Sequence, residues 1–180
     1  MADGVAAPAA LPNHLQLPCR DGVPVRDAIE APQSALLTES LSPLLSQLFP
    51  EDRYFIGADV GIYWRLVEER LRGAKSPDWY LVTEVPNLLD GEFRRSYVLW
   101  QEQRLPLILL EFAPSDSTEE HDRTPEEGKY WVYENRIRPS YLRHLLDRSG
   151  GVGNVSIHRQ EVQTPQAEQA KSLSNRTAVG

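Results

Sequence analysis

The sequence has one cysteine and no long apolar run, and each shortage excludes a class of protein. The single cysteine, Cys19, rules out an internal disulfide framework and a cysteine-rich zinc site. No apolar run approaches the roughly 20 residues that cross a bilayer, which favours a soluble, cytoplasmic protein that does not bind membranes. Lys and Arg number 19 against 26 Asp and Glu, so the net charge of −7 argues against holding nucleic acid through a bulk positive field. A small local basic groove is compatible with this charge.

The length of 180 residues suits one domain with loose ends. Residues 1–33 are rich in Ala and Pro and lack periodicity, which predicts a disordered lead. Residues 149–180 contain many Gly, Gln, Ser and Thr residues and too little apolar surface to offset the entropy of ordering. We therefore expect a disordered tail there, and a folded domain over residues 34–148.

The first part of this domain is predicted to contain a helix and three strands. Leucines spaced three and four apart give residues 34–49 one apolar helical face, and Pro43 inside it predicts a kink or two short helices. Apolar and β-branched residues predict strands over residues 54–64, 78–85 and 105–112. The third range is almost continuously apolar, which is typical of a strand buried on both faces. The charged residues 66–74 indicate an inserted helical turn or loop.

A second helix is predicted to begin near Thr124. Thr124 supplies a capping hydroxyl, Pro125 fits the first helical position, and Glu127 stands three residues after the cap. Pro139 stops the helix, which we expect to end between Asn135 and Ile137. The order helix, three strands, helix predicts an α/β fold with a mixed sheet.

Two carboxylates stand where chemistry could occur. Asp78 begins the second predicted strand, and Glu111 ends the most apolar one, where a buried carboxylate is costly unless it is paired or binds a cation. If the strands are neighbours, the two groups suit Mg²⁺, which takes one or two carboxylates together with water and phosphate. Lys129, early in the next helix, could reach the same point and neutralise developing charge. Solvated acids and a surface lysine are the alternative interpretation.

Four segments occur in a characteristic order: residues 77–82 (PDWYLV), 94–102 (RRSYVLWQE), 106–112 (PLILLEF) and 128–134 (GKYWVYE). Together they resemble the Uma2 family of restriction-endonuclease-like proteins, over about residues 54–141. That family has the PD-(D/E)XK nuclease fold, whose core runs helix, three strands, helix, strand. The resemblance therefore implies a restriction-endonuclease-like core, which agrees with the order of elements above.

The resemblance also implies roles for individual residues. Asp78 matches the aspartate of the PD element, and Glu111 matches the acid of the (D/E)XK element. Ala113 stands where the lysine of that element is usual, and Lys129 in the following helix takes its place. Asp78, Glu111 and Lys129 would be catalytic, and the two acids would hold Mg²⁺ or Mn²⁺. Asp59 is a weaker candidate ligand.

The implied activity is metal-dependent endonuclease cleavage of phosphodiester bonds in nucleic acid, with DNA as the expected substrate and a homodimer as the expected assembly. The sequence departs from the family at Pro114, where a serine is usual, and after Tyr141, where residues 142–148 indicate a helix. The last core strand is therefore expected to be lost or replaced. A non-catalytic binding protein on the same fold, and a fragment that does not fold stably alone, both stay open.

Overall fold

The computed structural model describes residues 10–19, 30–112, 122–144 and 158–159. The larger of its two sheets is made of β1 (Tyr54–Gly57), β4 (Trp79–Thr83), β6 (Ile108–Glu111), β7 (Tyr141–His144) and β8 (His158–Arg159), in that spatial order. β3 (Ala74–Lys75), β2 (Ile62–Tyr63) and β5 (Tyr97–Val98) form the smaller sheet. The fold is thus mixed α/β with strands of mixed orientation, as predicted.

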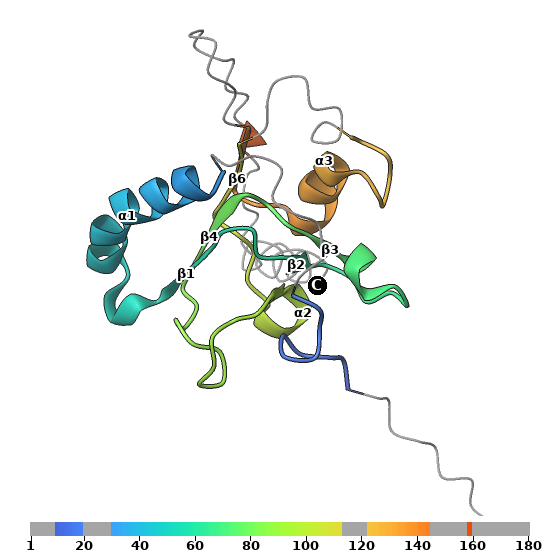
Figure 1. Ribbon diagram of the computed structural model, residues 1–180, viewed down its shortest axis with the longest axis horizontal. Helices are drawn as coiled ribbons and strands as arrows, with labels where there is room; N and C mark the ends of the chain where they lie inside the picture. Colours follow the sequence, from blue (N-terminus) through green and yellow to red (C-terminus); the bar gives the residue numbers. More distant parts are fainter. Residues whose placement is uncertain (1–9, 20–29, 113–121, 145–157, 160–180) are drawn as a thin grey trace, which may run out of the picture.

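Two helical layers cover the larger sheet (Figure 1). α1 (Glu30–Leu48) lies on one side, and α3 (Lys129–Val132) lies on the other and continues into the π-helical η3 (Tyr133–Ile137). The remaining helical turns are η1 (Pro50–Asp52), η2 (Arg70–Gly73) and α2 (Leu99–Glu102). None of the described helices is both long and apolar enough to span a bilayer.

The α1 helix is a single element with Pro43 inside it, so the sequence's alternative of two short helices is wrong. It also begins at Glu30, before the predicted start of the folded domain. Its inner face packs through Leu45 against Trp79 and Leu110, so this apolar contact holds the helix on the sheet.

The central strands bury side chains on both faces. Along β4, Trp79 packs in the apolar cluster between the sheet and α1, whereas the next residue, Tyr80, packs in the apolar cluster between the sheet and α3. Leu110 and Leu109 of β6 divide in the same way. This alternation follows from the period of two in a strand, and it confirms the prediction that the third apolar range is buried on both sides.

A strand is present where the sequence predicts a helix over residues 142–148. Tyr141–His144 form β7, which pairs in parallel with β6, so a strand is present at the position where the sequence predicts that a strand is lost or replaced. Tyr141 is exposed and Leu142 is buried, which is the alternation of a strand, so the predicted helix is wrong over residues 142–144. Residues 145–148 lie outside the described part of the chain. His158–Arg159 then pair with β7 as an antiparallel edge strand.

The predicted first strand divides between the two sheets. β1 ends at Gly57, and β2 begins at Ile62 in the smaller sheet. Between them, Asp59 has a φ of 52°, a left-handed conformation that breaks the extended run. The inserted turn was predicted correctly, as η2.

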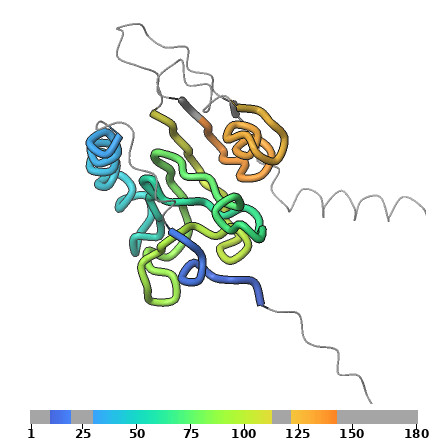
Figure 2. Tube along the Cα trace, turned by 45° about the vertical axis from the view of Figure 1, so that its right-hand side comes forward, coloured from blue at the N-terminus to red at the C-terminus, as the bar shows by residue number. Residues whose placement is uncertain are grey.

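Residues 10–19 run across the smaller sheet rather than forming part of a disordered lead. Leu17 is buried with Tyr63 and Val98. Two long-range hydrogen bonds fix the segment, from the Trp100 indole N–H to the Pro12 carbonyl (3.0 Å) and from the Tyr63 hydroxyl to the Pro18 carbonyl (2.7 Å). The segment passes alongside α2 in both views (Figure 1, Figure 2).

The second helix starts later than predicted, at Lys129, although it ends at Ile137 as expected. Thr124 does not cap it, because its hydroxyl and backbone N–H both donate to Asp122 Oδ1, at 2.6 and 2.8 Å. Gly128 is the capping residue, and the segment folds so tightly that a Cβ there would lie 2.4 Å from the Asp122 carbonyl oxygen. This glycine lets the chain turn directly into the helix that carries Lys129.

Candidate active site

The two predicted acids lie opposite each other on neighbouring strands. Antiparallel β4 and β6 pair Trp79 with Leu110, and continuing that register by one residue places Asp78 opposite Glu111. Directly opposed residues project from the same face of a sheet. The Phe112 N–H donates to Asp78 Oδ2 at 2.5 Å, which fixes the aspartate against the end of β6.

Glu111 holds two donors from the helical layer. Lys129 Nζ lies 2.8 Å from Glu111 Oε2, and the Tyr133 hydroxyl donates to Oε1 at 2.6 Å. The Glu111 side chain has 0% of its surface exposed, and that of Lys129 has 17%. Hydrogen bonds to a charged group are stronger than neutral ones, and in a site of low dielectric each is strengthened further.

The helical spacing explains how both donors reach one carboxylate. Lys129 and Tyr133 are four residues apart, so they lie on the same face of the α3–η3 helix. That helix forms the crossover between the parallel strands β6 and β7, which holds it over the sheet. Tyr133 was not among the predicted site residues; its spacing of four from Lys129 was the sequence signal for its contact with Glu111.

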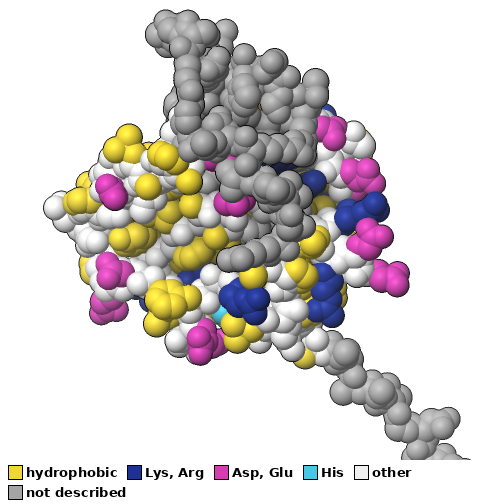
Figure 3. All heavy atoms as spheres, in the orientation of Figure 1, with side chains coloured by type: hydrophobic (Ala, Val, Ile, Leu, Met, Phe, Trp, Pro, Cys, Tyr) yellow, Lys and Arg dark blue, Asp and Glu magenta, His cyan; other side chains and the backbone are white. Residues whose placement is uncertain are grey.

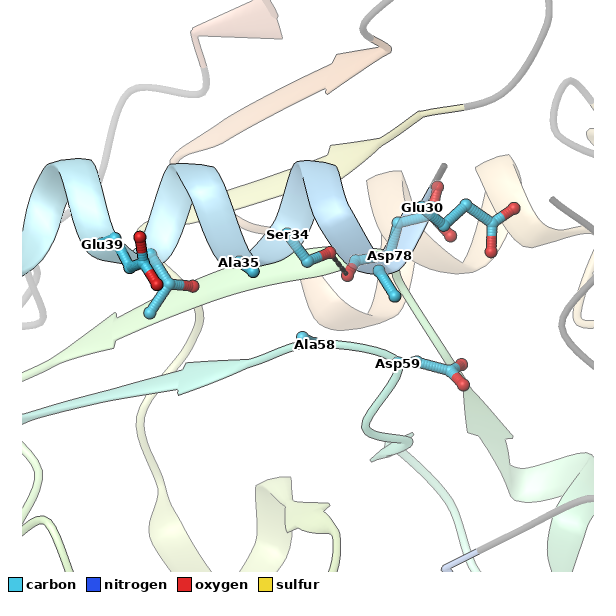
Figure 4. A pocket seen from close by; sticks show the side chains of 9 residues that line it. Glu30, Ser34, Ala35, Glu39, Ala58, Asp59 and Asp78 are labelled. Carbon is cyan, nitrogen blue, oxygen red and sulfur yellow. Dashed lines mark hydrogen bonds between the residues drawn. The ribbon is translucent and has the colours of Figure 1, made fainter. Parts of the chain in front are cut away.

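Asp59 is connected to Asp78 by a backbone hydrogen bond, and the two residues line the same pocket. Its N–H points to the Asp78 carbonyl at 3.3 Å, and both residues line a pocket of about 440 Å³ beneath the first turns of α1 (Figure 4). Ser34 of α1 also donates to the Asp78 carbonyl, at 3.2 Å. Asp59 is exposed at the edge of this pocket, whereas the Glu111 side chain bonds to Lys129 in the helical layer on the other side of the sheet. Asp59 therefore shares a pocket with Asp78 but not with Glu111.

The donor set fits a hard divalent cation with few protein ligands. Across the described ranges no group of three or more His, Cys, Asp and Glu side chains is placed to hold a metal. Mg²⁺ needs only one or two carboxylates, because it keeps several waters. Each carboxylate oxygen has two lone pairs, so the bonds to Glu111 and Asp78 leave capacity for a cation. Ala113 and Pro114, the two departures near Glu111, lie outside the described residues.

No protein-family model, curated protein or solved structure matches this chain.

Proposed function

We propose that the protein is a Mg²⁺-dependent nuclease with a restriction-endonuclease-like core, cleaving phosphodiester bonds of DNA. The observation that carries the proposal is the Glu111–Lys129 pair, placed across the strand register from Asp78. The order helix, three antiparallel strands, crossover helix and parallel strand supports it, as does the resemblance of the four sequence segments to Uma2 proteins.

Each residue has a distinct part in this proposal. Asp78 and Glu111 would hold the metal, which when bound polarises a phosphodiester oxygen and lowers the pKa of its bound water. Lys129 places a cation beside Glu111, where it can offset negative charge that develops on the phosphate. Tyr133 holds the Glu111 carboxylate in one orientation through its short hydrogen bond.

Calorimetric titration with Mn²⁺ and Mg²⁺ tests the site without any assumption about the substrate. Wild-type protein is expected to bind the metal, and Asp78→Asn is expected to lose binding and DNA cleavage while keeping its cooperative melt. Asp90→Asn is the matched control, because Asp90 is an exposed acid in the loop beyond the far end of β4. Retention of cleavage in both Asp78→Asn and Glu111→Gln would overturn the assignment.

A non-catalytic binding protein on the same fold is the second candidate. The observation that favours it is that Glu111 is fully buried and that both of its oxygens already accept hydrogen bonds from the helical layer. Such a group can serve as a structural ion pair between sheet and helix. This candidate predicts that neither metal changes the melting temperature of a protein that melts cooperatively.

A further inference from the structure

Two arginines from distant parts of the chain share one glutamate beside α3. Arg65, which follows β2, donates to Glu126 through Nη1 to the carboxylate (3.3 Å) and through Nη2 to the carbonyl (3.0 Å). Arg136 of η3 donates to the other oxygen of the same carboxylate. Two cations against one anion leave the cluster with an excess positive charge.

Indole rings hold both guanidinium groups in place. The Arg65 guanidinium lies 4.2 Å from the ring centroid of Trp64, and that of Arg136 lies 5.2 Å from Trp131 and 5.9 Å from Trp64. Cation–π contacts of this kind orient a guanidinium and leave its edge free to donate. The arginines are therefore ordered before any ligand arrives, which reduces the entropy lost on binding.

The cluster also remains accessible to solvent. The side chains of Arg65 and Arg136 are still 32% and 47% exposed. Basic and acidic side chains gather on the side of the molecule that carries α3 and η2 (Figure 3). A protein with a net charge of −7 thus has a local group of oriented cations.

We propose that Arg65 and Arg136 bind backbone phosphates of a nucleic acid strand, and that Glu126 occupies them in the free protein. Guanidinium forks match phosphate oxygens in a bidentate manner, and such contacts supply most sequence-independent affinity. Glu126 lies in the turn that precedes α3, three residues before Lys129, so one short segment carries both the acid of the cluster and the lysine of the candidate site. The inference deepens the proposed nuclease function by assigning the surface that holds its substrate.

Glu126 gives the proposal its distinguishing feature, because it competes with the phosphate. Removing its charge while keeping its shape (Glu126→Gln) should release both arginines and tighten binding. Removing the arginine charges (Arg65→Gln with Arg136→Gln) should weaken it. A gain of affinity in one variant and a loss of affinity in the other cannot both arise from misfolding.

Fluorescence anisotropy with a short labelled DNA duplex, in EDTA so that no cleavage occurs, measures these effects. We expect the double arginine variant to weaken binding about tenfold and to lower the salt slope by about two, one for each lost phosphate contact. Glu126→Gln should tighten binding about threefold. Arg104→Gln is the control, since Arg104 forms an exposed pair with Glu84 just beyond the other end of β4.

Failure of this inference can be separated from failure of the proposed function. Unchanged affinity in the arginine variant, or weaker binding in Glu126→Gln, would overturn the phosphate-binding assignment even if Asp78-dependent cleavage is observed. Absence of DNA binding in the wild-type protein would overturn it as well. Arginine-dependent binding without any cleavage would support this surface and reject the nuclease activity.

Discussion

The Glu111–Lys129 pair makes a quantitative prediction about stability, because its two members differ in solvent access. Lys129→Met removes the cation and leaves the fully buried Glu111 carboxylate short of its ion-pair partner. Removing one member of a buried pair costs about 3–5 kcal/mol. In a protein of this size 1 kcal/mol corresponds to roughly 2–4 °C, so the melting temperature should fall by about 10 °C.

Substitution of Glu111, the other member of the pair, should lower the stability by less. Glu111→Gln keeps an acceptor for the Tyr133 hydroxyl and leaves a lysine that is 17% exposed and can turn toward water. We expect a loss of about 1–3 kcal/mol. The variant carrying both substitutions has no buried charge at this point, so it should be more stable than Lys129→Met alone.

Thermal melts followed by circular dichroism in EDTA measure all three variants. Arg104→Met is the control, because its pair with Glu84 is 55% and 59% exposed, and such pairs contribute about 0–1 kcal/mol. The reasoning is refuted if Lys129→Met melts as the control does, or if Glu111→Gln is the more damaging single change. Either result would mean that the carboxylate is not buried against the lysine.

Two further predictions concern packing and pH. Gly57→Ala should lower the free energy of unfolding by about 1–3 kcal/mol, because its Cβ would lie 2.2 Å from the ring of buried Tyr80. Gly61→Ala is the control and should be nearly neutral, because its Cβ would meet Ser76 at an ordinary 3.6 Å. Urea titration of both variants measures the difference. Hydrogen bonds from the Thr124 hydroxyl and N–H lower the pKa of Asp122. Its contribution to stability is therefore present above the unfolded pKa of about 3.9 and is lost as the pH falls through the lower folded value. Thr124→Val should raise the Asp122 pKa in a carbon-detected NMR titration, and an unchanged value would contradict this account.

The sequence predicted the features that depend on local pattern and on strand neighbours. Glu111 at the end of an apolar run and Lys129 early in the next helix do meet, and the strand over residues 105–112 is buried on both faces. The start of the second helix was wrong because Thr124 is held by Asp122, a competing contact that a capping pattern does not reveal.

Long-range contacts account for the larger errors. Residues 10–19 have no periodicity, and their order depends on partners such as Tyr63 and Trp100, which lie far along the chain. β7 is short, so its alternation gives a weak signal, and its pairing with β6 decides its conformation. Tyr133 is buried, and its bond to Glu111 depends on the position of the helix over the sheet, which the sequence pattern does not specify.

The segment over residues 10–19 has a consequence for the order of folding. The segment packs on the smaller sheet, in which β2 pairs in parallel with β5, and these two strands are separated in sequence by the whole of β4. Bringing β2 and β5 together carries an entropic cost that must be met before the smaller sheet can form. The earliest described residues to leave the ribosome therefore have no surface to occupy until much of the later chain has folded. They are synthesised before the strands that they cover, and we expect them to reach their native positions only after those strands have paired.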